Sequence, residues 1–328
     1  MRQVSNIASF LPGSRAFLTL AVVLGLAIAR PTRAQEKPEP QAACVPLDLN
    51  ALIVPEGSRV HVRERKEGLD RTGNQSGRAL SSSAANNPSD ARGQKEIYDV
   101  FSKEARQGNP AAMTNLAVSS LAGWGGKPNA GAALYWLHAA ADRGYGAAFY
   151  DLGILYFKGC GVPQDMAEAF HFFELGAQGG YAPAQVNLGY FYDHGLGVAQ
   201  DHAAAAQWYG RAAESGEAQA QYNLGDSYLH GEGVPHDELK AFEWYQKAAL
   251  QGHSGARIMA GSMLAAGRGT SKDLASAYLW TFAAVLQGDA RGVPLLRTLE
   301  RQLRGAEIEE AKARAQLLLA GLEAAKNR

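Results

Sequence analysis

The chain has 328 residues, of which 46% are hydrophobic and 20% charged, and its formal net charge at pH 7 is 0. A chain of this length can bury a sizeable core. Because it has no excess of basic residues and no basic stripe, it lacks the electrostatic footprint of a nucleic-acid-binding protein, and we exclude that class.

Residues 1–34 have the composition of a secretory signal peptide. Arg2 and Arg15 precede or flank an apolar run at Ala16–Ala29, which is shorter than the roughly 20 residues that a membrane-spanning helix needs. We predict cleavage after Ala34, which gives a periplasmic or secreted chain with no transmembrane segment. A retained N-terminal anchor is the alternative. Cleavage would remove four arginines and no acidic residue, and would lower the formal charge to about −4.

Residues 35–94 differ in composition from the rest of the chain and are predicted to form an irregular N-terminal arm. Residues 72–94 are rich in Ser, Asn, Gly and Ala. They carry too little apolar side chain to offset the entropy of ordering, so we predict a disordered linker. Apolar residues return at helical spacing in residues 95–107, where we expect a helix that caps the first repeat.

The chain has two cysteines, Cys44 in the arm and Cys160 in the second repeat. Export would permit a disulfide between them, which would tie the arm to the repeats. Two separate thiols are the alternative, and the sequence leaves both open.

Residues 108–287 repeat with a period of 36 residues. Glycine recurs at the first place of each unit and just after the last one: Gly108, Gly144, Gly180, Gly216, Gly252 and Gly288. Alanine holds the fifth and twenty-sixth places, leucine holds the ninth place in the first four units, and glycine holds the tenth place in the last four. A fixed period of this length is typical of stacked helical units without a single central core. The five predicted units are 108–143, 144–179, 180–215, 216–251 and 252–287.

Each unit is predicted to contain two helices, with places counted from the first glycine. Helix A covers places 3 to 15, where Ala220, Leu224 and Tyr228 form one apolar stripe in the fourth unit. A Gly-x-Gly turn ends helix A. Asp237 at place 22 is typical of an N-cap, and helix B follows with Trp244 at place 29.

Two further local structures follow from the same pattern. Asp165 and Glu168 have the spacing of a capping box at the start of the second helix B. Residues 288–328 lose the period but keep helical stripes, so we predict C-terminal capping helices there.

The pattern AxxxLGxxYxxGxGVxxDxxxAxxWxxxAA resembles the Sel1-like repeat, a relative of the tetratricopeptide repeat. The first and last units depart from it, for example with Asn129 in place of the capping Asp and Ala260 in place of Leu. The resemblance implies an all-α, right-handed α-solenoid of helix-turn-helix units that binds proteins or peptides. It also implies a setting in bacterial envelopes or the eukaryotic secretory pathway, where some exported bacterial relatives regulate or scaffold membrane partners.

Places 4, 8, 11, 12 and 15 of helix A lie beside the core stripe at 100° per residue, and we expect them to line a concave groove. The candidate partner-binding residues on these places are Asn115, Asp151, Leu155, Asn187, Tyr190, Phe191, Asn223 and Asp226. An Asn ladder can hold the main chain of an extended peptide, while aromatic side chains supply apolar anchors. Alternatively, the asparagines hold the turn between repeats from within.

The sequence contains no motif that would carry catalysis or hold a cofactor. The Gly-x-Gly-Val turns lack the Lys-Ser/Thr of a phosphate-binding loop, and the eight histidines have no metal-ligand spacing. We therefore predict no catalytic residue, no cofactor and no metal site.

The predicted function is a non-enzymatic scaffold, adaptor or regulator in the periplasm that binds another protein or peptide through the groove. In a variant of this hypothesis, the N-terminal arm occupies the groove. The alternative from another class is a hydrolase or a protein that binds cell-wall fragments.

Overall fold

The computed structural model describes residues 91–326, which form thirteen α-helices and a short 3-10 helix, with no strand in this range. The signal peptide and residues 35–90 of the arm lie outside the described residues. The helices are α1 (Ala91–Arg106), α2 (Pro110–Ala122), α3 (Ala130–Ala141), α4 (Gly146–Lys158), α5 (Met166–Gln178), α6 (Ala182–His194), α7 (His202–Glu214), α8 (Ala218–His230), α9 (Glu238–Leu250), α10 (Ser254–Ala266), α11 (Leu274–Leu286), η2 (Ala290–Gly292), α12 (Val293–Glu300) and α13 (Gly305–Lys326).

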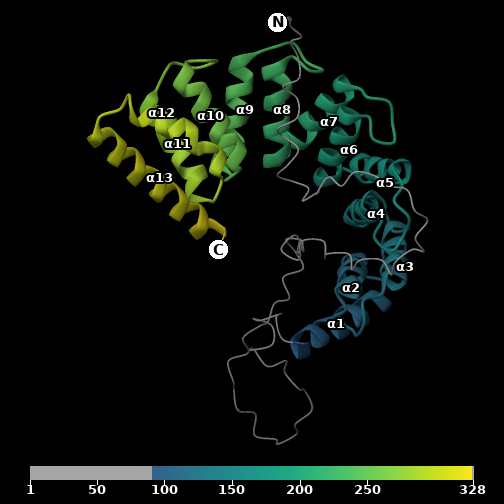
Figure 1. The fold of residues 1–328 in the computed structure, drawn as a ribbon. Coiled ribbons are helices and arrows are strands. Elements are labelled where there is room, and N and C mark those ends of the chain that lie inside the picture. Colours follow the sequence, from purple (N-terminus) through teal and green to yellow (C-terminus); the bar gives the residue numbers. More distant parts are fainter. Residues whose placement is uncertain (1–90, 327–328) are drawn as a thin grey trace, which may run out of the picture. The chain divides into compact units, whose positions relative to one another are not determined.

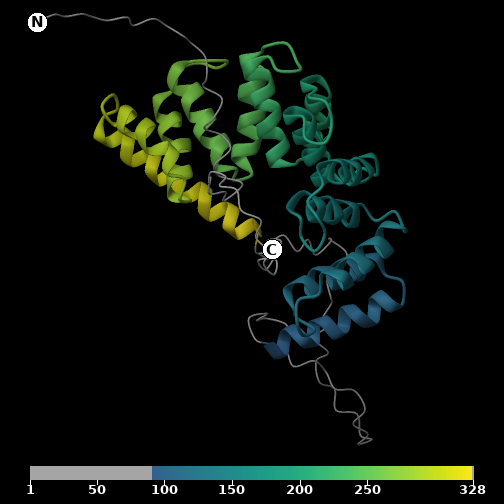
Figure 2. The same cartoon turned by 45° about the vertical axis from the view of Figure 1, so that its right-hand side comes forward.

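The five repeats supply ten of these helices in strict alternation. The A helices are α2, α4, α6, α8 and α10, and the B helices are α3, α5, α7, α9 and α11. Each A helix packs on the B helix that follows it, and each B helix packs on the next A helix (Figures 1 and 2). The buried residues accordingly fall into several successive clusters along the chain. The predicted all-α solenoid is confirmed.

The helix ends follow the sequence pattern closely. In the fourth unit, Gly231 ends α8 with φ 70°, a left-handed conformation that glycine adopts without a steric cost. The Asp237 side chain then accepts a hydrogen bond from the Lys240 amide at 3.0 Å and starts α9. The Asp237 amide in turn donates to the Tyr228 carbonyl at 2.9 Å, which closes the loop between the two helices.

Only one of the two halves of the predicted capping box in the second unit forms, namely the half made by the Asp165 side chain. The Asp165 side chain accepts hydrogen bonds from the amides of Ala167 and Glu168, at 2.9 and 3.1 Å. The reciprocal bond from the Asp165 amide to the Glu168 side chain is replaced, because that amide donates to the Tyr156 carbonyl at 3.0 Å. The prediction that Glu168 completes the capping box is therefore wrong. The Asp165 amide instead makes the loop-closing hydrogen bond that the Asp237 amide makes in the fourth unit.

The glycine at place 10 of helix A receives the side chain at place 30 of helix B. A Cβ added to Gly153 would lie 2.6 Å from the Phe173 ring, and Gly189 and Tyr209 meet in the same way. Phe173 and Tyr209 are buried, whereas Trp208 at place 29 is half-buried. The ring at place 30 therefore fills the space between the two helices. The sequence pattern pointed to the aromatic residue one position earlier, at place 29.

Neighbouring units are joined by polar side chains at place 6. Gln185, Gln221 and Arg257 each donate to the carbonyl at place 34 of the preceding helix B, at 3.0 to 3.2 Å. These side chains are buried, and each bond gives a second donor to a carbonyl that also accepts from the amide of the glycine that opens the next unit.

Helices flank the repeats on both sides: α1 precedes them, and α12 and α13 follow. Helix α1 begins at Ala91, four residues before the predicted start, so the last part of the predicted linker is helical. At the other end, α13 packs against α11 and buries Ala311 and Ala315. Within the described range, no helix is both long and apolar enough to cross a membrane.

Candidate functional site

The candidate site is the face of the A helices formed by places 4, 8, 11 and 15, which we call the A-helix surface. Six of the predicted partner-binding residues lie on it and are half-buried: Asn115, Asp151, Asn187, Tyr190, Asn223 and Asp226. Half-burial leaves part of each side chain open to contact from outside.

The two predicted residues at place 12 lie elsewhere. Leu155 and Phe191 are each 1% exposed and belong to the hydrophobic clusters. The Phe191 ring packs against Phe157 and Phe173, with centroid distances of 5.7 and 5.1 Å. Place 12 points only about 20° away from place 5 on a helical wheel, so it joins the core stripe. Neither side chain is accessible on the A-helix surface, and our revised surface omits both.

Asp226 on α8 is held by tyrosine hydroxyls. The Tyr245 hydroxyl, from α9, donates a hydrogen bond to Asp226 Oδ1. Burial raises the pKa of Asp226 to about 6, while hydrogen bonds from Tyr245 and Tyr222 act in the opposite direction. Its carboxylate oxygens therefore already have donors within the protein.

Among residues 91–326, no such donor reaches Asp151 on α4. Burial raises the pKa of Asp151 to about 7, and no hydrogen bond or ion pair offsets that effect among the described residues. Burial, and after it the negative charge of Asp151, raises the pKa of Tyr145, Tyr150 and Tyr181. The Tyr150 and Tyr181 rings meet edge to face with centroids 5.7 Å apart.

The asparagines at place 8 have partners inside the protein. Asn187 Nδ2 donates to the Pro183 carbonyl at 3.0 Å, and Asn223 Oδ1 accepts from Gln219 Nε2 at 2.8 Å. Hydrogen bonds from Asn187 to the Tyr150 hydroxyl and from Asn223 to the Tyr209 hydroxyl partly counter the rise that burial causes in the pKa of each phenol. Part of the hydrogen-bonding capacity of these asparagines therefore serves the packing of the repeats.

Sequence reasoning missed the tyrosines beside Asp151. Tyr145 and Tyr181 stand at place 2, immediately before an A helix, and Tyr150 stands at place 7. The recurrence of Tyr at place 2 in two neighbouring units was visible in the period. Their position follows from stacking, because the place-7 ring of one unit packs on the place-2 side chain of the next.

One cluster of side chains could offer ligand atoms to a metal ion. Asp193, His202 and Glu232 each have an oxygen or nitrogen within 4.8 Å of the others. His202 Nδ1 and Asp193 Oδ1 lie 2.7 Å apart, which is the distance of a direct hydrogen bond. Glu232 is exposed, and the Asp193–His202 pair is sufficient to account for this arrangement.

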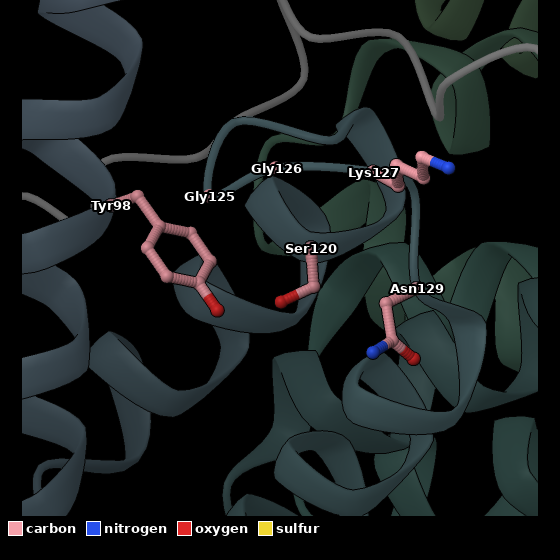
Figure 3. Close-up of a pocket in the computed structure, with 6 residues that line it drawn as sticks. All are labelled: Tyr98, Ser120, Gly125, Gly126, Lys127 and Asn129. Carbon is pink, nitrogen blue, oxygen red and sulfur yellow. The ribbon is translucent and has the colours of Figure 1, made fainter.

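A hollow of about 330 Å³ lies between α1 and the loop from α2 to α3. Its lining consists of Tyr98, Ser120, Gly125, Gly126, Lys127 and Asn129. Figure 3 shows the Tyr98 ring beside Gly125 and the Ser120 side chain, with the Lys127 amine pointing away from the ring. This lining holds no carboxylate and no histidine.

Cys160, one half of the predicted disulfide, is buried in the cluster formed by the first two repeats. Cys44 lies outside the described residues. The predicted bond between them stays a prediction.

The chain matches the Sel1 repeat family over residues 110–145, 147–181, 182–217, 218–253 and 254–289. It belongs to the Sel1 repeat family. These matches cover more than half of the chain and begin about two residues after the unit boundaries expected from the glycines. Proteins built from Sel1 repeats typically act as scaffolds for protein interactions.

Solved structures of Sel1 repeat proteins show the same fold. A protective antigen present in uropathogenic Escherichia coli strains is 30% identical, with a TM-score of 0.63 over 70% of this chain and 53% of the antigen. This chain therefore spans about half of the length of that antigen. A Sel1 repeat protein from Oxalobacter formigenes is 27% identical, with a TM-score of 0.57 over 71% of this chain and 97% of its own. A search of curated proteins gave no match.

Proposed function

We propose that this Sel1 repeat protein is an exported, non-enzymatic scaffold or regulator that binds a segment of another envelope protein on its A-helix surface. The observation that carries the proposal is the row of half-buried polar and aromatic side chains along successive A helices, at Asp151, Asn187, Tyr190 and Asn223. A stack of identical units presents such a row at regular spacing, which suits an extended segment.

Export is supported by the sequence of residues 1–34, which has the basic start, apolar run and small residues of a signal peptide. Export would place the chain in the periplasm or outside the cell, where its partner would be a protein of the envelope. The likeness to a protective antigen of a pathogenic bacterium is compatible with such a setting.

Cross-linking in cells, followed by mass spectrometry, tests the proposal. The native chain is compared with the variant Tyr190→Ala/Asn223→Ala, which truncates two side chains on the A-helix surface. The matched control is Gln207→Ala/Gln246→Ala, which truncates two exposed side chains on B helices. We expect one partner to be captured by the native chain and the control and to be lost with the A-helix variant.

Equal capture by all three proteins would refute the A-helix surface as the binding site. Capture of no partner by the native chain would refute the scaffold function itself. Circular dichroism of both variants confirms that any loss of capture does not come from unfolding.

A further inference from the structure

Asp193, His202 and Glu232 meet at the junction between the third and fourth units. Asp193 lies in the last turn of α6, His202 is the first residue of α7, and Glu232 lies in the turn after α8. One potential ligand atom from each side chain lies within 4.8 Å of the other two. His202 Nδ1 and Asp193 Oδ1 are 2.7 Å apart. One nitrogen and two oxygens from three different elements therefore converge at this junction.

The stacking of the units brings Glu232 and His202 together. A Cβ added to Gly233 would collide with the His202 carbonyl, so the Gly-x-Gly turn of the fourth unit rests on the start of α7. The turns of the third and fifth units rest in the same way on the backbone of Met166 and Glu238. The residue between the two glycines, at place 17, therefore lies beside place 23 of the preceding unit, and here these are Glu232 and His202.

Places 17 and 23 match each other in chemistry at the two neighbouring junctions. Leu196 and Met166, between the second and third units, are apolar and pack against the same hydrophobic cluster. Arg268 and Glu238, between the fourth and fifth units, form an ion pair with Nη2 and Oε1 2.6 Å apart. The junction at His202 differs from both, because one imidazole there faces two carboxylates.

The two carboxylates at this junction are not balanced by a cation. The hydrogen bond between Asp193 and His202 accounts for those two side chains, and Glu232 makes none of the nine ion pairs found within residues 91–326. His194 lies nearby, but its Nδ1 faces the Tyr190 carbonyl at 3.0 Å, so we do not count it as a ligand. Carboxylates at such a separation repel each other, and a divalent cation bound between them removes that repulsion.

We propose that Asp193, His202 and Glu232 bind a divalent transition-metal ion, for which Zn²⁺ is the best match. Zinc takes imidazole and carboxylate ligands in tetrahedral sites and accepts water at a fourth position, whereas Ca²⁺ and Mg²⁺ prefer oxygen ligands alone. Ligand atoms about 2.1 Å from a tetrahedral zinc ion lie about 3.4 Å from one another. The atoms here lie within 4.8 Å, and the exposed Glu232 side chain can move to close the difference.

The bound ion would link two units of the solenoid, because Asp193 and His202 belong to the third unit and Glu232 to the fourth. None of the three residues stands at place 4, 8, 11 or 15, so the site is separate from the A-helix surface. The inference therefore does not depend on the proposed function.

The test is a calorimetric titration of ZnCl₂ into the full chain, purified without an affinity tag and freed of metal with a chelator. MgCl₂ is the control ion. The variants are His202→Ala and Glu232→Gln, which each remove one proposed ligand. The matched controls are His171→Ala and Glu243→Gln, which remove an exposed imidazole on α5 and an exposed carboxylate on α9.

We expect the native chain and both controls to bind one Zn²⁺ ion with the same affinity and to bind Mg²⁺ more weakly. His202→Ala and Glu232→Gln should each bind Zn²⁺ at least about tenfold more weakly, since even a residue that only supports a metal ligand contributes that much. In the NMR spectrum, zinc should shift the ring signals of His202 and leave those of His171 unchanged.

Three results would overturn the proposal. The first is that the native chain binds no zinc, the second that His202→Ala binds it as tightly as His171→Ala, and the third that Glu232→Gln binds it as tightly as Glu243→Gln. Circular dichroism establishes that the variants are folded. Glu232 is exposed, so Glu232→Gln should keep the fold and decides the question even if His202→Ala does not fold.

Discussion

Replacing Gly153 with Ala tests how helices A and B fit together. A Cβ at Gly153 would lie 2.6 and 2.7 Å from Cε1 and Cδ1 of Phe173, well inside ordinary van der Waals contact. The ring has little room to retreat, because Phe173 is fully buried and packs against Phe191 and Tyr150 with centroid distances of 5.1 and 5.9 Å.

Two effects of opposite sign decide the size of the change. Extra atoms in a well-packed core cost about 1–3 kcal/mol. Alanine in a helix interior is about 1 kcal/mol more favourable than glycine. We expect the packing term to win, so that Gly153→Ala lowers the free energy of unfolding by up to about 2 kcal/mol.

The matched control is Gly210→Ala in the interior of α7, where an added Cβ meets nothing within 4 Å. This substitution should raise the free energy of unfolding by about 0.5–1 kcal/mol, because only the helix propensity changes. Urea unfolding of both variants, followed by circular dichroism, measures the two changes. If Gly153→Ala is as stable as Gly210→Ala, the close fit of place 10 against place 30 is refuted.

Three further predictions concern capping, pH and export. Asp165→Ala removes the side-chain acceptor of two α5 amides and should cost about 1 kcal/mol in urea unfolding, and an unchanged value would contradict the capping role. The folded Asp151 carboxyl has a pKa of about 7 against 3.8 for the unfolded group, so the native chain should lose stability between about pH 4 and pH 7 as the unfolded carboxyl ionises first. Asp151→Asn should remove that part of the slope and be more stable than the native chain at pH 8, whereas a native–variant difference that is the same at pH 4 and pH 8 would refute the burial of this charge. Mass spectrometry of the envelope fraction should find a chain that begins at Gln35, and an intact chain confined to the cytoplasm would refute export.

The fold was predictable because the sequence pattern of each helix end occurs in five units, which can be compared with one another. Every unit repeats the same helix stops and N-caps, so helix boundaries such as those of α8 and α9 were expected to within a residue. The start of α1 was not, since residues 91–94 combine Gly and Gln with one Ala and one Arg and show no apolar spacing. The helical wheel correctly grouped residues at places 4, 8, 11 and 15 on one surface. It wrongly added place 12 to that surface, although place 12 lies within about 20° of place 5, which faces the core.

The chemistry of the site was less predictable, because it depends on contacts between units. The sequence marks Asp151 and Asp226 as polar residues on the same face. It does not show that Tyr245 reaches Asp226 from helix B, or that Asp151 has no hydrogen bond or ion pair with another residue of the range 91–326. These differences arise from the residues at places 2, 7 and 30, whose neighbours are set by how one unit stacks on the next.

The measurement that tests the central claim most directly places a photo-cross-linking amino acid at single exposed positions of the chain in cells. Gln219 lies at place 4 on the A-helix surface, and Gln246 lies on helix α9 away from that surface. Binding on the A-helix surface predicts an adduct with one envelope protein from position 219 and none from position 246. An adduct from position 246 alone would contradict the account and move the binding site to the B helices.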